Sequence, residues 1–108
     1  MKEIIIFKNA LFSVQYDCET QMIIFYDSDD KYIEDWREND LSLDFVVKTI
    51  YFLSQKSEIE VAEYFGELTG YKHKVYNNPS AEEEKYIRDN YSEEWFCRFG
   101  NTYLVMEG

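Results

Sequence analysis

The sequence contains few of the residues on which disulfide-rich or metal-stabilised small domains depend. Among its 108 residues are two cysteines, one histidine, one proline and four glycines. Cys18 and Cys97 lie far apart and form no C-x-x-C pair, so we interpret them as free, buried thiols in a reducing compartment. The glycines form neither G-x-G nor G-K-S/T, which disfavours nucleotide-dependent chemistry. We interpret His73 as an ordinary surface side chain.

Long apolar runs are also missing. The longest uninterrupted runs are four or five residues, and no basic segment precedes a hydrophobic one at the start of the sequence. Such runs are too short for a membrane span or a secretory signal. We therefore expect a soluble, cytoplasmic protein without a membrane partner.

Basic residues are scarce: 11 lysines and arginines oppose 22 acids, which gives a net charge of -11 at pH 7. This charge repels nucleic acid phosphates and attracts basic protein surfaces over roughly a Debye length. The hydrophobic content of 45% and the aromatic content of 19% exclude general disorder. A chain of this length buries enough surface to fold as a single compact domain, residues 1–108, without a disulfide or metal.

The first 27 residues predict a three-stranded antiparallel meander. Residues 4–7 are a continuous apolar run, which favours a strand buried on both faces at the centre of a sheet. Residues 11–17 alternate between apolar and polar, and residues 22–26 form another apolar run after a polar turn.

Helical spacing of apolar residues predicts a central pair of antiparallel helices between residues 43 and 69. Ser42 is the expected N-cap of the first helix, and Phe45 and Phe52 widen its apolar arc, so we expect it to be covered on more than one side. Ser57 and Glu60 form a capping box for the second helix, which Gly70 ends.

The C-terminal third predicts a peripheral helix and a hairpin. A second capping box, Ser80 with Glu83, begins a helix over residues 81–90 whose apolar stripe is thin. Residues 95–99 and 102–106 flank a Gly-Asn turn. We predict an α+β fold in which one antiparallel sheet, formed by the meander and this hairpin, packs against the helix pair.

Acidic residues are concentrated between residues 27 and 44, where eight acids and two bases give a net charge of -6. The pattern leaves a loop, a short strand or a helical turn open. Four of these acids match positions 1, 3, 9 and 12 of a calcium loop, but Lys31 occupies the fifth position and Tyr32 stands where glycine is required. We therefore expect no metal and no cofactor.

A second acidic row, Glu60, Glu63 and Glu67, lies on one face of the second helix, with neighbours about 5 to 6 Å apart. This spacing is similar to that of phosphates along a nucleic acid strand, and interleaved aromatics are typical interface anchors. The predicted partner-binding residues are Asp27, Asp29, Asp30, Tyr32, Glu34, Asp35, Trp36, Glu38, Asp40, Glu60, Glu63 and Glu67.

From these features we predict a non-enzymatic protein that blocks a basic, nucleic-acid-binding surface of a larger protein. In size and charge the chain is similar to phage-encoded anti-CRISPR and anti-restriction proteins, which implies an inhibitor or nucleic acid mimic. One alternative is an immunity or antitoxin-type protein that neutralises a basic toxin. The oligomeric state is left open.

A second alternative is a small transcription factor. Residues 61–66 resemble the first helix and turn of helix-turn-helix DNA-binding domains, with Ala62 at the tight-packing position and Gly66 four residues later. The sequence departs from that pattern at Glu67 and Lys72, where apolar residues are expected. The charge of -11 also opposes binding to DNA.

Overall fold

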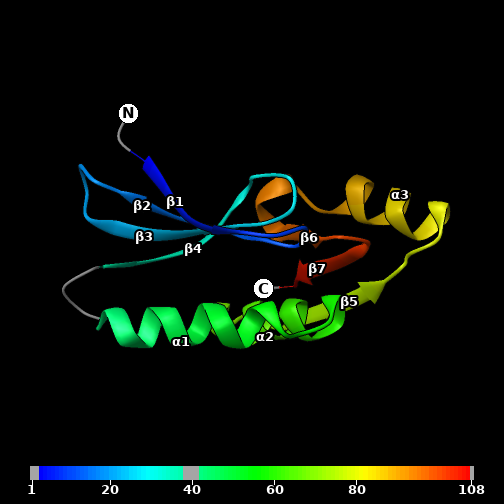
Figure 1. The fold of residues 1–108 in the computed structure, drawn as a ribbon. Helices are drawn as coiled ribbons and strands as arrows, with labels where there is room; N and C mark the ends of the chain where they lie inside the picture. Colours follow the sequence, from blue (N-terminus) through cyan, green and yellow to red (C-terminus); the bar gives the residue numbers. More distant parts are fainter. Residues whose placement is uncertain (1–2, 38–41, 108) are drawn as a thin grey trace. The chain divides into compact units, whose positions relative to one another are not determined.

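The computed structural model describes residues 3–37 and 42–107 (Figure 1). It divides the chain into two compact units, with the boundary between Lys56 and Ser57. The described residues form three α-helices and two antiparallel sheets, so the predicted α+β class is confirmed. The single domain stays a prediction, and each unit is described by itself. No helix within the described ranges is long and apolar enough to cross a bilayer.

The first unit is a four-stranded antiparallel meander with one helix. Its strands follow one another in the order β1-β2-β3-β4. They are β1 (Glu3–Lys8), β2 (Ser13–Asp17), β3 (Met22–Tyr26) and β4 (Tyr32–Arg37). The three predicted strands are present, and the acidic segment supplies the fourth. Of the three conformations left open there, the strand is the one formed.

The first helix of the predicted pair is present as α1 (Leu43–Ser54), and the side chain of its predicted N-cap, Ser42, accepts a hydrogen bond from the Phe45 amide at 3.1 Å. The helix and the sheet share an aromatic cluster, because the Trp36 ring lies 4.8 Å from that of Phe25 and 5.6 Å from that of Phe45. Phe25 and the neighbouring Val14, with which it pairs across β2 and β3, are wholly buried.

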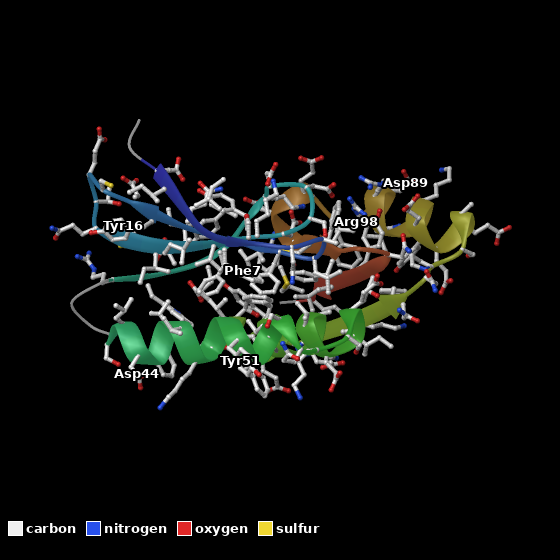
Figure 2. All side chains as sticks on the ribbon, viewed as in Figure 1. Phe7, Tyr16, Asp44, Tyr51, Asp89 and Arg98 are labelled. Atoms are coloured by element: carbon white, nitrogen blue, oxygen red, sulfur yellow. The ribbon has the colours of Figure 1, made fainter. Side chains whose placement is uncertain are left out.

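Two predictions about burial in this unit are wrong. The run from Ile4 to Phe7 was expected at the centre of the sheet, but β1 is an edge strand and exposes 58% of Ile4, 59% of Ile5 and 45% of Ile6. Helix α1 was expected to be covered on more than one side, but it buries a single stripe. Phe45 and Phe52 lie outside that stripe and are exposed, and Tyr51 projects into solvent (Figure 2).

The second unit places a three-stranded sheet between helices of unequal burial. Its elements are α2 (Glu58–Thr69), β5 (His73–Asn77), α3 (Ala81–Asn90), a 3-10 turn (Glu93–Trp95), β6 (Phe96–Phe99) and β7 (Thr102–Met106). Both predicted capping boxes are formed, and Gly70 ends α2 in the left-handed region at φ 76°. Helix α3 buries only Ile87, as its thin stripe predicted.

The C-terminal hairpin lies in its own sheet instead of sharing one with the meander, because β5 pairs with the open side of β7 to give the order β5-β7-β6. Helix α2 packs on this sheet, where the Phe65 and Phe99 rings stack with centroids 5.4 Å apart. Helices α1 and α2 belong to different units, so their antiparallel pairing stays a prediction.

Candidate partner-binding site

The turn between β3 and β4 is organised by one buried carboxylate. Asp27 is 2% exposed, and its Oδ1 accepts hydrogen bonds from the amides of Asp29 and Lys31, both at 2.9 Å. The Asp27 amide donates to the Lys31 carbonyl at 2.9 Å, and Asp30 takes a left-handed φ of 60°, which aspartate tolerates better than most residues. Asp27 therefore holds the turn and presents almost no surface to a partner.

The acidic residues that follow Asp27 lie on this turn and on strand β4. Asp29 and Asp30 are exposed at its tip, and Tyr32, which is 52% exposed, lies at the start of β4. The Tyr32 hydroxyl donates to Asp35 at 2.8 Å. Partial burial of the phenol and this bond raise the pKa of Tyr32 to about 12, so at neutral pH it remains a donor. Glu34 and Asp35 are partly buried along β4.

We call the set Asp29, Asp30, Tyr32, Glu34 and Asp35 the acidic hairpin. Trp36 is partly buried, and its ring lies in the aromatic cluster with Phe25 and Phe45. Its role in partner binding stays a prediction. The predicted site residues Glu38 and Asp40 lie outside the described residues.

The predicted acidic row on α2 is exposed, but its members have local partners. Glu60 accepts hydrogen bonds from the Ser57 amide at 3.1 Å and the Ser57 hydroxyl at 3.0 Å. The Glu60 amide donates to Ser57 Oγ at 3.3 Å, which completes the capping box. Glu63 Oε2 lies 3.1 Å from His73 Nε2. This hydrogen bond is the main reason why the pKa of His73 is raised, and the charges of Glu63 and Glu67 add to the effect.

His73 is the functional candidate that the sequence interpretation missed. Its ring lies against Gly66 of α2, where a Cβ would stand within 2.6 Å of Nε2 and 2.7 Å of Cγ. Nδ1 lies 3.3 Å from the Tyr71 carbonyl oxygen, so the proton on Nδ1 can be held there while Nε2 faces the carboxylates. The sequence shows Gly66 between two glutamates one helical turn apart, with His73 after the helix, but this pattern does not by itself place the ring over the glycine.

Glu63, Glu67 and His73 offer ligand atoms that all lie within 4.8 Å of one another. Imidazole and carboxylate groups are ligands that zinc accepts. Within the described ranges this is the grouping of acidic, histidine and cysteine side chains compact enough to hold an ion. Its shortest separation is the 3.1 Å between Glu63 Oε2 and His73 Nε2, which the ion pair itself explains. The carboxylates of the acidic hairpin do not form a group of this kind.

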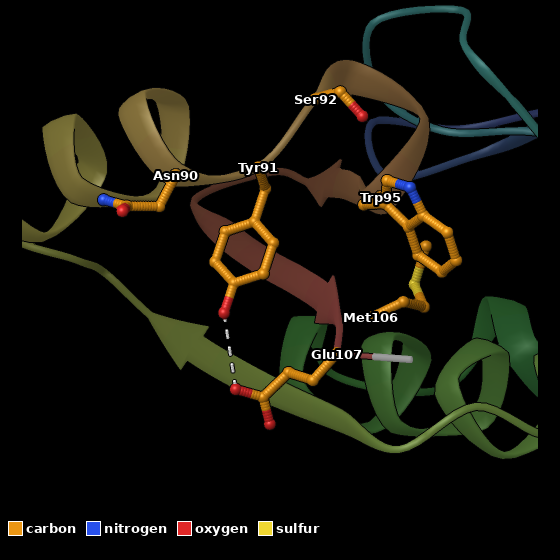
Figure 3. A pocket seen from close by; sticks show the side chains of 6 residues that line it. All are labelled: Asn90, Tyr91, Ser92, Trp95, Met106 and Glu107. Atoms are coloured by element: carbon orange, nitrogen blue, oxygen red, sulfur yellow. Dashed lines mark hydrogen bonds between the residues drawn. The ribbon is translucent and has the colours of Figure 1, made fainter.

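A shallow hollow of about 350 Å³ lies between α3 and the end of β7 (Figure 3). Tyr91 and Trp95 stand on its two sides, and the Tyr91 hydroxyl approaches Glu107 at 3.5 Å. It is lined by Asn90, Tyr91, Ser92, Trp95, Met106 and Glu107. The aromatic and thioether groups suit a small apolar side chain better than a charged ligand.

The fold and these surfaces define an acidic α+β protein with two small antiparallel sheets. No protein-family model matches the sequence, and no curated protein or solved structure shows significant similarity to it. The helix-turn-helix resemblance does not extend to the structure. Helix α2 continues through Gly66 to Thr69, and residues 73–77 form strand β5 where a recognition helix is required.

Proposed function

We propose that this chain is a non-enzymatic binding protein that occupies a basic, normally nucleic-acid-binding surface of a larger protein. The acidic hairpin is the observation that supports the proposal. Asp29 and Asp30 stand exposed on a turn fixed by the buried Asp27 carboxylate, with the exposed Tyr32 ring beside them. A binding surface that is ordered before contact loses less conformational entropy on association.

The charge distribution favours a basic partner. Acids on an exposed turn contribute little to folding stability, whereas they accelerate encounter with a surface of opposite sign. The net charge of -11 adds long-range attraction to a basic surface, and it opposes direct binding to DNA or RNA. The proposed role is therefore that of an inhibitor or nucleic acid mimic, in size and charge similar to anti-CRISPR and anti-restriction proteins of phages.

We assign this activity to the cytoplasm as part of the same proposal. Both cysteines are free, and Cys18 is exposed while Cys97 is buried, so the expectation that both are buried is wrong for Cys18. An exposed free thiol suits a reducing compartment, where glutathione keeps it reduced. Neutralisation of a basic toxin is the alternative that uses the same surface.

The partner is first identified by affinity capture from the native host. Surface plasmon resonance then compares the wild type with the double variant Asp29→Lys and Asp30→Asn. Asparagine is chosen at position 30 because it tolerates the left-handed backbone. The control, Glu19→Lys with Glu94→Gln, makes the same charge change at two exposed sites outside the acidic hairpin.

We expect the hairpin variant to associate about tenfold more slowly at low salt and to lose part of the salt dependence of the on-rate. The control should remain within about twofold of wild type. Equal on-rates for wild type and hairpin variant, with unchanged circular dichroism, would refute the proposal. Displacement of nucleic acid from the captured partner supports a mimic, whereas a captured toxin without nucleic acid affinity supports the alternative.

A further inference from the structure

Among the residues that the structure describes, strand β1 has a neighbouring strand on one side only, so one edge of the meander is open. It pairs with β2 on one side and ends the strand order on the other. Natural edge strands are protected by proline, by charge, by a β-bulge or by a covering segment. Strand β1 has a bulge between Ile5 and Phe7, but its apolar run Ile4–Phe7 contains neither proline nor charge. Three successive isoleucines on such an edge are each about half exposed. This edge has the composition of an interior strand.

The strand is self-complementary in charge. Its sequence is EIIIFK, so antiparallel pairing of two copies about its centre places Glu3 opposite Lys8 at both ends. The same register places Ile4 opposite Phe7. Opposite charges and apolar side chains that face each other across an antiparallel pair are both stabilising.

A β-bulge makes this register possible. In a regular strand Glu3 and Lys8, which are five positions apart, point to opposite faces. The register with β2 shifts between Ile5 and Phe7, so Glu3 lies opposite Asp17 and Lys8 opposite Ser13. Positions 13 and 17 share a face of β2, and therefore Glu3 and Lys8 share a face of β1. Paired residues in a two-fold symmetric sheet must share a face, and the bulge satisfies this condition for Glu3 with Lys8 and for Ile4 with Phe7.

An apolar groove continues from the same edge. It has a volume of about 490 Å³ and lies beside β1 and the first turns of α1. Its lining residues are Ile4, Ile6, Tyr16, Ile23, Leu43, Val46 and Val47. A second strand placed along β1 would extend the sheet beside this groove and remove Ile4 and Ile6 from water.

We propose that β1 binds β1 of a second copy of this chain. Antiparallel pairing about a two-fold axis near Ile5 and Ile6 joins two four-stranded sheets into one sheet of eight strands. The interface is isologous, because the same patch contributes to both sides, and it closes as a dimer without leaving an edge for further growth at β1. This inference is independent of the proposed function.

The overall charge sets the conditions for this dimer. Two chains of -11 repel each other, and salt screens this repulsion more than it weakens two short-range ion pairs. Sedimentation velocity at about 5 to 500 µM protein should show a growing dimer fraction, larger at about 0.5 M than at about 0.05 M salt.

The substitution Ile5→Lys places like charges near the axis and should raise the dimer dissociation constant about tenfold or more. Ile59→Lys is the matched control, because Ile59 is 43% exposed on α2 and lies in the other unit. A monomer at all concentrations in high salt would overturn the proposal. A dimer that resists Ile5→Lys, or one that Ile59→Lys dissociates, would do the same.

A charge exchange tests the register. Lys8→Glu places Glu3 opposite a glutamate at both ends and should weaken the homodimer, and Glu3→Lys should weaken it likewise by placing two lysines opposite each other. The two variants mixed should form a heterodimer, because the glutamate introduced at position 8 of one chain then faces the lysine introduced at position 3 of the other. Failure of the mixture to associate more tightly than either variant alone would overturn this register.

Discussion

Substitution of Gly66 by alanine should destabilise the protein, although the same substitution in an ordinary helix interior stabilises it. In a helix interior, alanine is more favourable than glycine by about 1 kcal/mol. Gly66 lies well inside α2 and is buried. The Cβ of an alanine there would stand 2.6 Å from Nε2 and 2.7 Å from Cγ of His73, with Cδ2 closer still. These separations are about 1 Å shorter than ordinary van der Waals contact.

The magnitude follows from three contributions. The imidazole ring must move away from the helix, and overpacking of this kind costs about 1–3 kcal/mol. The movement also breaks the bond between Nε2 and Glu63, which as a partly exposed ion pair stabilises by up to about 1 kcal/mol. The gain in helix propensity offsets about 1 kcal/mol of this loss. We expect Gly66→Ala to lower the free energy of unfolding by about 0–3 kcal/mol, with a central value of roughly 1.5 kcal/mol.

A double-mutant cycle with His73→Ala separates the contributions. Without the ring, Gly66→Ala should stabilise the protein by up to about 1 kcal/mol, so the sign of its effect reverses. Urea unfolding followed by Trp95 fluorescence in a Trp36→Phe background reports on the second unit, which contains both residues. A gain in stability on Gly66→Ala while His73 is present would show that the ring does not lie over this glycine.

Two further predictions concern stability. Folding raises the pKa of His73, so its stabilising contribution is full below the unfolded value of 6.5 and is lost as pH rises through the folded pKa. In chelator-treated protein the free energy of unfolding, measured by urea titration, should fall by up to about 1 kcal/mol between about pH 6 and 8. His73→Gln should remove this fall. Asp27→Ala leaves the amides of Asp29 and Lys31 without their buried acceptor and should cost about 1–3 kcal/mol by Trp36 fluorescence, whereas Asp27→Asn, which retains an acceptor oxygen, should recover most of the loss.

The helices could be predicted nearly to the residue because their ends are encoded locally. Ser42, Ser57 and Ser80 each accept a hydrogen bond from an amide three positions later, and this pattern is visible in the sequence. The turn at Gly100 was likewise local. Such features depend on neighbours within one helical turn or one hairpin, so tertiary structure does not need to be known.

Burial could not be predicted in the same way, because it depends on which elements supply the neighbours. An apolar run such as Ile4–Phe7 indicates a need for burial but does not state whether a strand, a helix or another chain satisfies it. The structure supplies a neighbour on one side only, which is why β1 is an edge. The same reasoning explains why β5 joined the hairpin in a separate sheet.

In the candidate site, too, some features could be predicted from the sequence and others required the structure. Acidic composition identified the segment around Asp29, but the role of Asp27 as the acceptor inside the turn required the backbone conformation. Similarly, the row on α2 was visible from its spacing. The position of His73 over Gly66 depends on the packing of β5 against α2, which no local pattern determines.

The two proposed interactions of the first unit respond to salt in opposite directions. Partner binding through the acidic hairpin relies on attraction between unlike charges, so added salt slows association. Pairing through β1 relies on backbone hydrogen bonds and isoleucine burial against a repulsion between chains, so added salt strengthens it. The β3–β4 turn lies at the same end of the meander as the β1–β2 turn, where the Ser28 hydroxyl donates to the carbonyls of Ala10 and Leu11, whereas β1 and β4 lie at opposite edges. A strand paired along β1 therefore leaves the β4 edge uncovered, and a dimer would present two acidic hairpins, which raises the apparent affinity for a partner with two basic sites.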